Sequence, residues 1–357
     1  MKTWLITGGA GFIGSNFVLS ACVNNVARII TLDKLTYAGH MENLKSLEGN
    51  HNHIFIKGDI GDTDLVNRLL QEYRPSTIIN FAAESHVDRS ILGPQAFIAT
   101  NVVGTHALLA NVLQYWKSLN TRSSTDFRFL HISTDEVYGS LETDTPAFTE
   151  EHPYRPNSPY AASKAASDHL VRAYYHTYGL PTLTTNCSNN YGPYQHPEKL
   201  VPLIILNARA GKPLPIYGDG RQIRDWLYVE DHCAALRTVL ERGHPGETYN
   251  IGGNCERTNL DIVQTLCQIL NDMFTENAPH ERLIMHVTDR PGHDRRYAVN
   301  SGKIQRELSW RPQIGLEQGL TRTVQWYIDH ADWIRSVNSA QHEQWLRDNY
   351  QSRGVTT

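Results

Sequence analysis

The sequence predicts an α/β fold in which a doubly wound parallel sheet is followed by a smaller, mixed C-terminal domain. Strand-like and helix-like segments alternate through the first half of the 357 residues, which is typical of βαβ units. A glycine-rich turn, "TGGAGFIG", directly follows the first strand-like segment. From about Asn189 the chain becomes richer in proline and glycine, which indicates the loops of a second, ligand-covering region.

The strands of the predicted sheet are short runs rich in β-branched and aromatic residues, bounded by turn residues. In chain order they are "TWLIT", "ARIITLD", "HIFIKGD", "STIINFAA", "FRFLHIST" and "PTLTTNCSN". Helical patterns predict helices over residues 12–23, 63–73 and 94–119, and a further helix in "SPYAASKAASDHLVRAYYHTYG" that stops at Gly179. A later segment, "IRDWLYVEDHCAALRTVLE", is predicted to form one more strand and helix.

Composition argues against several classes of protein. The net charge is −4, so bulk electrostatics favour neither a nucleic-acid nor a membrane partner. The first residues run straight into a strand, and no run approaches the ~18 apolar residues that span a bilayer, so we expect a cytoplasmic protein without a signal peptide. The five cysteines lack CxxC spacing and the 17 histidines lack ligand spacing, so we expect reduced thiols and no metal.

The glycine-rich turn is a candidate dinucleotide site. Gly8, Gly11 and Gly14 lie between the first strand and the first helix, where glycine allows a tight turn and close approach of a pyrophosphate to the helix N-terminus. The pattern alone is also compatible with an ordinary strand-to-helix turn. Asp33 ends the second strand, where a carboxylate can accept both ribose hydroxyls and repel a 2′-phosphate. We therefore predict NAD rather than NADP, bound on a Rossmann-like sheet.

A tyrosine and a lysine form the second candidate group. Tyr160 and Lys164 are four residues apart at the start of a predicted helix, so both side chains project from one face. A nearby ammonium and the positive ring of an oxidised nicotinamide would both favour the phenolate, so Tyr160 could remove a proton from an alcohol. Taken alone, the pair is also compatible with two neighbours on a surface helix.

Two adjacent carboxylates follow the strand "RFLHIST". Burying Asp135 and Glu136 at the end of a strand is costly unless solvent, partners or chemistry account for them. They could form a solvated strand end or a helix cap. They could also divide acid and base work, since like charges so close push the two pKa values apart.

Taken together, the motifs resemble the dTDP-glucose 4,6-dehydratases, in the nucleotide-sugar branch of the extended short-chain dehydrogenase/reductase family. The resemblance covers residues 1 to about 325. It rests on "TGGAGFIGSNF", "KLTYAG", "NFAAESHVDRSI", "STDEVYG", "PYAASKAASDHLVRAYYHTYGLP", "NCSNNYGPYQHPEKL" and "GDGRQIRDWLYVEDH". Epimerases of this branch usually carry small hydroxyl residues where this chain has Thr134-Asp135-Glu136, and related decarboxylases resemble Thr-Ser-Glu there.

The resemblance implies a lyase that oxidises the sugar at carbon 4, eliminates water across carbons 5 and 6, and returns hydride to carbon 6. Glu136 would be the base at carbon 5, Asp135 the acid at carbon 6, and Thr134 would hydrogen-bond the carbon 4 oxygen. Tyr160 and Lys164 complete the expected catalytic set. NAD would remain tightly bound and be regenerated in each turnover, giving dTDP-4-dehydro-6-deoxy-glucose for deoxysugar synthesis, such as that of dTDP-rhamnose.

The resemblance also implies a cofactor set along the first four strands. Asp59 has two interpretations, because an aspartate there could meet the adenine edge or cap the following helix. The full set of expected NAD contacts is Gly8, Gly11, Phe12, Ile13, Gly14, Asp33, Lys34, Leu35, Thr36, Asp59, Ile60, Phe81, Ala82, Ala83, Thr100, Tyr160, Lys164 and Asn190.

Substrate contacts are expected from the second half of the chain. Arg224 can pair with phosphate through its planar fork, or instead with Asp225 or Asp231. Taken singly, His293 and Tyr297 are more typical of surface loop residues than of pyrophosphate and base contacts. The implied substrate set is Glu84, Ser85, Thr134, Asn189, Lys199, Leu200, Pro215, Ile216, Tyr217, Arg224, Asn259, Asp289, Arg290, Pro291, Gly292, His293 and Tyr297.

We expect three parts in the chain. Residues 1–188 would form the NAD-binding domain, with a returning segment near 225–242; residues 189–330 would bind the nucleotide sugar, and 331–357 would form a C-terminal helix or tail. The family resemblance implies a homodimer built on the helix at 94–119 and the helix after Tyr160, although their apolar faces also fit packing on the sheet alone. The alternatives are a dehydratase for UDP- or CDP-glucose, and a non-catalytic NAD-binding protein of the same fold.

Overall fold

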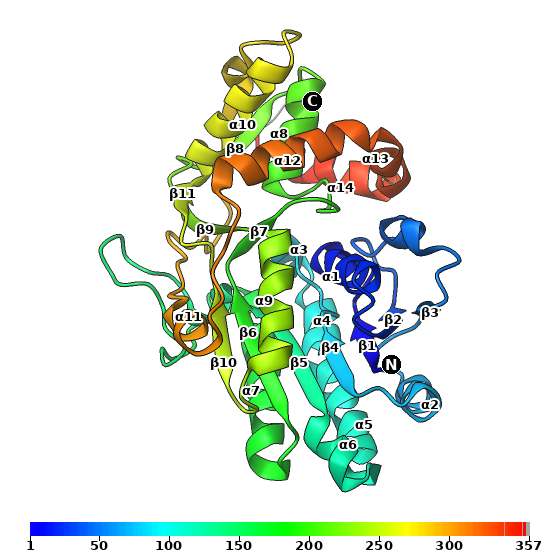
Figure 1. Cartoon of the computed structure of the whole chain (residues 1–357). Coiled ribbons are helices and arrows are strands. Elements are labelled where there is room, and N and C mark those ends of the chain that lie inside the picture. The colour runs from blue at the N-terminus through cyan, green and yellow to red at the C-terminus, as the bar shows by residue number, and fades with distance from the viewer. Residues whose placement is uncertain (339, 352, 355–357) are drawn as a thin grey trace.

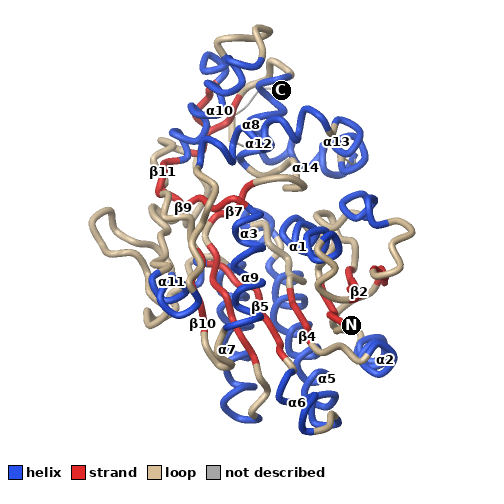
Figure 2. The backbone as a smooth tube through the Cα atoms, viewed as in Figure 1, coloured by secondary structure: helices blue, strands red, loops and turns tan. Residues whose placement is uncertain are grey.

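The computed structural model describes residues 1–338, 340–351 and 353–354, and is built around one large parallel sheet (Figures 1 and 2). Seven strands lie in the order β10-β6-β5-β4-β1-β2-β3, and every neighbouring pair is parallel. These strands are β1 (Thr3–Thr7), β2 (Arg28–Asp33), β3 (His53–Lys57), β4 (Thr77–Asn80), β5 (Arg128–Thr134), β6 (Thr182–Cys187) and β10 (Thr248–Ile251). The predicted fold class is confirmed.

Consecutive apolar residues of the strands face opposite sides of the sheet, and helices cover both sides. Ile6 packs in a core with α1 (Phe12–Val23) and α9 (Val229–Arg242). Its neighbour Leu5 packs on the other side, against α2 (Thr63–Tyr73), α5 (Thr105–Ser118) and α7 (Pro159–Tyr178). Each fully buried leucine or isoleucine contributes about 1.5–3 kcal/mol, so this two-sided burial stabilises the continuous apolar strands.

The helix predicted over 94–119 is divided. It consists of α4 (Pro94–Phe97), a π-helical segment η2 (Ile98–Gly104) and α5. By length and composition alone, Pro94–Ser118 could cross a membrane, so the expectation that no run approaches that length is wrong. Half of its most apolar window is buried inside this molecule, as in the core helix of a globular protein.

A smaller region stands beyond the carboxyl ends of the large sheet (Figure 1). It contains a three-stranded sheet, β11-β9-β7, and a two-stranded sheet, β12-β8. The strands are β7 (Asn189–Tyr191), β8 (Leu214–Tyr217), β9 (Ile223–Tyr228), β11 (Glu256–Thr258) and β12 (Ile284–Val287). Helices α8 (Leu200–Arg209), α10 (Asn259–Met273) and α12 (Leu316–Asp329) pack with them around a separate apolar core.

The chain passes several times between the two regions. β9 belongs to the small sheet, whereas the helix that follows, α9, packs on α1, and β10 adds an edge strand to the large sheet. The remaining helical segments are short: η1 (Met41–Leu47), α3 (Val87–Leu92), α6 (Thr121–Asp126), η3 (Asp135–Tyr138), η4 (His280–Leu283), α11 (Gly302–Leu308), α13 (Ala331–Val337) and α14 (Ala340–Gln351). Parts of the predicted tail, residues 339, 352 and 355–357, lie outside the described residues.

Candidate active site

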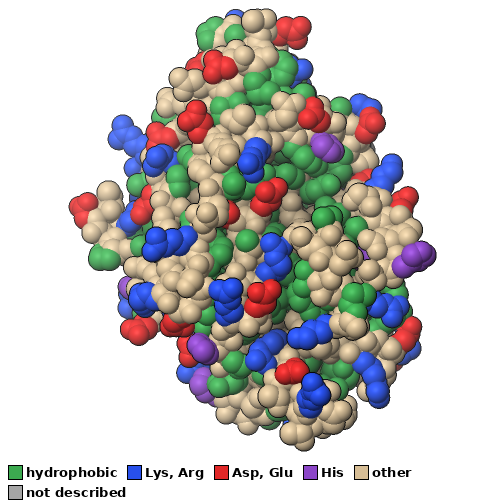
Figure 3. All heavy atoms as spheres, viewed as in Figure 1, with side chains coloured by type: hydrophobic (Ala, Val, Ile, Leu, Met, Phe, Trp, Pro, Cys, Tyr) green, Lys and Arg blue, Asp and Glu red, His purple; other side chains and the backbone are tan. Residues whose placement is uncertain are grey.

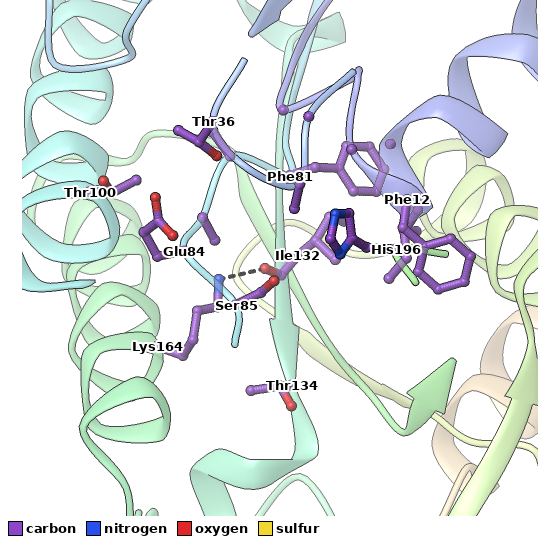
Figure 4. Close-up of a pocket in the computed structure, with 18 of the residues that line it drawn as sticks. Phe12, Thr36, Phe81, Glu84, Ser85, Thr100, Ile132, Thr134, Lys164 and His196 are labelled. Carbon is purple, nitrogen blue, oxygen red and sulfur yellow. Dashed lines mark hydrogen bonds between the residues drawn. The ribbon is translucent and has the colours of Figure 1, made fainter. Parts of the chain in front are cut away.

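An open cavity of about 310 Å³ lies where the carboxyl ends of β1 and β4 meet. The chain leaves β1 toward β2 and β3 on one side, and then crosses to β4 and β5 on the other. Such a switch point leaves a crevice between loops that run in opposite directions, and open parallel sheets bind their ligands there. Figure 4 shows side chains from both halves of the sheet pointing into this cavity.

The glycine turn forms one wall of the cavity and leaves no room for side chains. Gly8 has φ +69°, and a Cβ there would meet the backbone N of Ala82 at 2.5 Å. A Cβ on Gly14 would collide with the carbonyl oxygen of Gly8. No side chain caps α1 at Gly11, so the first N–H groups of the helix are available to an anion. The turn therefore fits the diphosphate of a dinucleotide.

Asp33 is fixed at the end of β2 by two backbone groups. Its Oδ2 accepts a hydrogen bond from Ala10 N at 2.9 Å, and its Oδ1 accepts one from Leu35 N at 2.8 Å. Burial raises the pKa of this carboxyl, and the two hydrogen bonds oppose that rise. Each oxygen keeps a further lone pair, so the carboxylate can still accept ribose hydroxyls.

Asp59 does not cap the helix that follows it. The N-cap of α2 is Asp62, whose side chain accepts a hydrogen bond from Leu65 N. Asp59 instead forms an ion pair with Lys34 at 2.6 Å and accepts a hydrogen bond from Gly61 N at 2.8 Å. Both interactions lower the pKa of Asp59 against the opposing effect of burial. Of the two sequence-based alternatives, the helix cap is wrong.

Tyr160 and Lys164 lie in the first turns of α7, which begins at Pro159 after the capping residue Ser158. Both side chains are buried at the cavity wall. The ammonium of Lys164 donates a hydrogen bond to the carbonyl oxygen of Ile132 at 2.7 Å, drawn as a dashed line in Figure 4. Helix α7 and strand β5 thereby fix the lysine between them.

Burial dominates the titration of this pair. It lowers the pKa of Lys164, against the raising effects of Asp168 and Cys187. It also raises the pKa of Tyr160 well above its usual value, with further raising by Glu136 and Cys187, whereas a hydrogen bond with Thr134 lowers it. Burial thus outweighs the expected lowering of the Tyr160 pKa in the protein alone, and the positive nicotinamide ring, the second group expected to favour the phenolate, acts on Tyr160 only when NAD is bound.

Asp135 and Glu136 lie just beyond β5, in the 3-10 turn η3. Thr134 ends the strand, donates a hydrogen bond from Oγ1 to Asp135 Oδ1 at 3.4 Å, and accepts one from Glu136 N at 3.3 Å. Asp135 is 1% exposed. Asp135 Oδ2 and Glu136 Oε2 are buried and make no hydrogen bond within the described part of the chain. Both residues line the cavity, and these two oxygens keep their capacity to accept a hydrogen bond.

The two carboxyl groups experience different fields. Burial raises the pKa of Asp135 well above its usual value, and Glu136 and Asp225 raise it further. Burial also raises the pKa of Glu136, but Arg290, Arg224 and Lys199 oppose that rise. Asp135 thus holds its proton more strongly than Glu136, which is the order that an acid and a base side by side require.

Most of the predicted catalytic and cofactor residues line this one cavity, whereas only some of the predicted substrate residues do. All five predicted catalytic residues line it, as do all predicted cofactor residues except Leu35. Of the predicted substrate residues, Glu84, Ser85, Thr134, Asn189 and Lys199 line it. The other predicted substrate residues do not line it and belong to segments of the second half of the chain: Leu200, Pro215, Ile216, Tyr217, Arg224, Asn259, Asp289, Arg290, Pro291, Gly292, His293 and Tyr297.

Arg224 is held by backbone and aromatic groups. It donates to the carbonyl oxygen of Asp294 at 3.0 Å, and its guanidinium lies 4.3 Å from the ring centroid of Tyr297. Asp225 and Asp231 instead accept hydrogen bonds from backbone N–H groups. The expectation that Arg224 pairs with one of these aspartates is therefore wrong.

His293 and Tyr297 are not surface loop residues. The His293 side chain is 7% exposed and lies 2.6 Å from Asp289 Oδ1, and Tyr297 is 3% exposed and donates a hydrogen bond to Asp294. Burial, together with the charges of Arg290 and Arg224, lowers the pKa of His293 to about 4, against the raising effect of Asp289. Neutral His293 can therefore stand beside these guanidinium groups.

Sequence reasoning missed part of the cavity wall. Glu198 is the most informative omission, because it is buried and pairs with Arg89 at 3.0 Å, and it lies within the quoted motif "NCSNNYGPYQHPEKL". The other cavity residues are mainly small or apolar and carry no periodic signal. They are Leu32, Ala38, Gly39, Gly58, Ile132, Ser133, Cys187, Ser188, Gln195 and His196.

A dinucleotide turn, a Tyr/Lys pair and two adjacent carboxyl groups in one crevice define a cofactor-dependent enzyme of the extended short-chain dehydrogenase/reductase type. A family model described as GDP-mannose 4,6 dehydratase matches residues 5–323. The chain belongs to this family.

Relatives and solved structures agree with this placement. The chain is 62% identical over 339 residues to a dTDP-glucose 4,6-dehydratase of Xanthomonas campestris, covering 94% of this chain and 96% of the relative. It is 52% identical over 357 residues to one of Salmonella typhimurium, covering 98% and 99%. A dTDP-glucose 4,6-dehydratase from Streptomyces venezuelae, solved with NAD and dTDP bound, superposes with a TM-score of 0.85 at 45% identity, covering 94% and 100%.

Proposed function

We propose that this protein is an NAD-dependent dTDP-glucose 4,6-dehydratase, a hydro-lyase that forms dTDP-4-dehydro-6-deoxy-glucose and water. One observation carries the proposal. Asp135 and Glu136 stand side by side in the cavity that also holds Tyr160 and Lys164. A dinucleotide turn and a Tyr/Lys pair account for oxidation alone, whereas eliminating water needs an acid and a base as well.

The cofactor set fits NAD. The glycine wall leaves space for the diphosphate, and the uncapped start of α1 supplies N–H donors. The carboxylate of Asp33 at the end of β2 suits the ribose hydroxyls and repels a 2′-phosphate. Bound there, NAD would supply a hydride acceptor for carbon 4 and, once reduced, a hydride donor for carbon 6, so no external oxidant would be consumed.

The chain's own residues move the protons. Tyr160 would remove the proton of the carbon 4 hydroxyl, with Thr134 donating a hydrogen bond to the carbon 4 oxygen. The ketone acidifies the proton on carbon 5, which Glu136 would take. Asp135, which holds its proton more strongly, would protonate the hydroxyl that leaves carbon 6. Glu136 would finally return its proton to carbon 5.

The nucleotide diphosphate would lie along the smaller region. Arg224 and Arg290 bring guanidinium groups close enough to Glu136 to lower its pKa. Arginine is suited to bind a diphosphate because its planar fork donates two parallel hydrogen bonds. Asn259, another predicted substrate contact, is the first residue of α10.

The reaction can be tested with the purified protein and no added NAD. We would incubate it with dTDP-, UDP-, CDP- and GDP-glucose in parallel and follow the mass of each product. Loss of one water from dTDP-glucose alone is the expected result. Unchanged mass would indicate an epimerase, loss of carbon dioxide a decarboxylase, and preferential conversion of the UDP or CDP sugar would contradict the proposed base.

We further propose a homodimer in the cytoplasm. The helices expected at the interface carry exposed apolar side chains: Ile98 is 47% exposed, Val103 is 59% exposed, and Tyr178 at the end of α7 is 47% exposed. Burying these side chains against a second copy would remove apolar area from water. The face seen in Figure 3 instead mixes positive and negative side chains. Sedimentation of the wild type, compared with Val103→Lys, tests the dimer.

A further inference from the structure

The C-terminal helix α14 contacts a predicted nucleotide residue. Asn349 Nδ2 donates a hydrogen bond to the hydroxyl of Tyr217 at 3.0 Å. The guanidinium of Arg353 lies 4.5 Å from the centroid of the Tyr217 ring, and the ring of Tyr350 lies 6.2 Å from it. Tyr217 itself is only partly buried, so part of its ring remains accessible. Helix α14 thus contacts the Tyr217 side chain through Asn349 and Tyr350, and Arg353, just beyond the helix, lies over the ring.

The hydroxyl of Tyr217 has a second partner on the opposite side of the crevice. It donates a hydrogen bond to Asp88 Oδ2 at 3.0 Å, and Asp88 Oδ1 lies 3.3 Å from Arg290 Nη1. Asp88 belongs to α3, next to the large sheet, and is 4% exposed. A chain of contacts therefore runs from Asn349 through Tyr217 and Asp88 to Arg290.

The position of α14 is also fixed from the large-sheet side. The ring of Trp345 lies 4.9 Å from the ring of His86, and the guanidinium of Arg89 lies 4.4 Å from the Trp345 ring. Arg89 in turn forms its ion pair with the buried Glu198 of the cavity wall. Because both regions hold α14, Asn349 has a fixed place from which to orient Tyr217.

We propose that Asn349 is a positioning residue for the nucleotide, acting through the hydroxyl of Tyr217. This inference rests on the proposed function, in which Tyr217 contacts the nucleotide part of the substrate. An aromatic ring held at its hydroxyl by a donor and an acceptor is already ordered before the ligand arrives. The ligand then does not have to order that side chain, a cost that otherwise weakens binding.

The test measures binding of dTDP by calorimetry, together with kcat and KM for dTDP-glucose. Asn349→Ala should weaken dTDP binding and raise KM about three- to tenfold, which corresponds to one immobilised side chain. Its kcat and NAD content should match those of the wild type, since Asn349 does not line the cavity. Asn349→Leu, which is similar in size but can neither donate nor accept a hydrogen bond, should give the same loss.

The matched control is Gln344→Ala on the same helix. Gln344 is exposed, and its hydrogen bonds join it to Asp348 and Arg347 within α14. This variant should bind dTDP like the wild type. If it loses as much affinity as Asn349→Ala, any disturbance of the helix is sufficient and the proposal fails.

A double-mutant cycle separates positioning from general support. Tyr217→Phe removes the hydroxyl through which Asn349 acts, so adding Asn349→Ala to it should weaken binding no further. Additive losses would overturn the proposal, as would unchanged dTDP affinity in Asn349→Ala. Failure of the wild type itself to bind dTDP, with normal folding and bound NAD, would instead contradict the proposed function.

Discussion

The ammonium of Lys164 and the carbonyl oxygen of Ile132 are joined by a hydrogen bond of 2.7 Å between α7 and β5. The residues on either side of Ile132 engage Asp168, one helical turn beyond the lysine. Ser133 donates a hydrogen bond to Asp168 Oδ2 at 2.7 Å, and His131 Nε2 lies 3.2 Å from Asp168 Oδ1. Strand β5 therefore fixes the lysine and a carboxylate on the same helix.

Replacing Asp168 with asparagine should move the alkaline limb of the kcat profile to lower pH. Burial lowers the pKa of Lys164, while Asp168 and, more weakly, Cys187 oppose this. Without the Asp168 charge, the lysine loses its proton at a lower pH, and its support for the Tyr160 phenolate ends sooner. We would measure kcat against pH for Asp168→Asn and for Ser133→Ala, which keeps the charge. Superimposable alkaline limbs for Asp168→Asn and the wild type would contradict this role.

Replacing Glu136 with glutamine should stop turnover after oxidation of the sugar. The amide cannot take the proton from carbon 5, so the reduced nicotinamide should stay bound and remain visible by its near-ultraviolet absorbance. Loss of a positioned general base reduces rates by about 10²–10⁴-fold. An overall rate equal to that of the wild type would remove Glu136 from the mechanism.

Replacing Asp135 with asparagine should separate elimination from proton exchange. The variant retains Glu136, so exchange of the carbon 5 proton with deuterated solvent should continue, whereas loss of water from carbon 6 should slow far more. Mass measurement of deuterium uptake and of product formation in one reaction compares both steps. Equal slowing of the two would show that the carboxyl groups do not divide the work as proposed.

Replacing Gly14 with alanine should empty the cofactor site. The added Cβ would collide with the carbonyl oxygen of Gly8 and approach Gly9 Cα at 2.9 Å, and a backbone wall cannot give way as a flexible side chain could. The purified variant should carry less NAD than the wild type and should depend on added NAD for activity. Gly49→Ala is the control for a glycine replacement, because a Cβ there meets nothing within 4 Å, although its φ of +76° adds local strain.

The large sheet and the catalytic residues could be predicted from the sequence more fully than the contacts around the predicted substrate residues. The first helix was predicted at its observed bounds, Phe12–Val23, because glycine, strand and helix signals there are all local. The polar composition after residue 340 gave no sign that α14 docks on the site. Its contacts are made by single residues, such as Trp345 on Arg89 and Asn349 on Tyr217, which join distant parts of the chain and leave no periodic pattern.

The same physics explains why the sequence alternatives for Asp59 and Arg224 could not be resolved beforehand. Each alternative depended on which of several nearby polar groups a side chain reaches, and that choice is made by tertiary packing. Asp62 takes the cap of α2, which leaves Asp59 to Lys34. Backbone N–H groups occupy Asp225, which leaves Arg224 to Tyr297.

Asp135→Asn should also change how stability depends on pH. Burial and the neighbouring Glu136 raise the pKa of Asp135 well above 3.8 in the folded chain, so the unfolded chain loses this proton first as pH rises. The carboxyl therefore contributes stability that is fully present below its unfolded pKa and is lost as pH rises toward the folded value. Asparagine does not titrate, so the variant's Tm should gain on that of the wild type as pH rises from about 4, close to the ordinary aspartate pKa, to about 8, well above it. Thermal unfolding of both proteins with NAD bound measures this difference, and a constant Tm difference across that range would show that folding does not raise the pKa of Asp135.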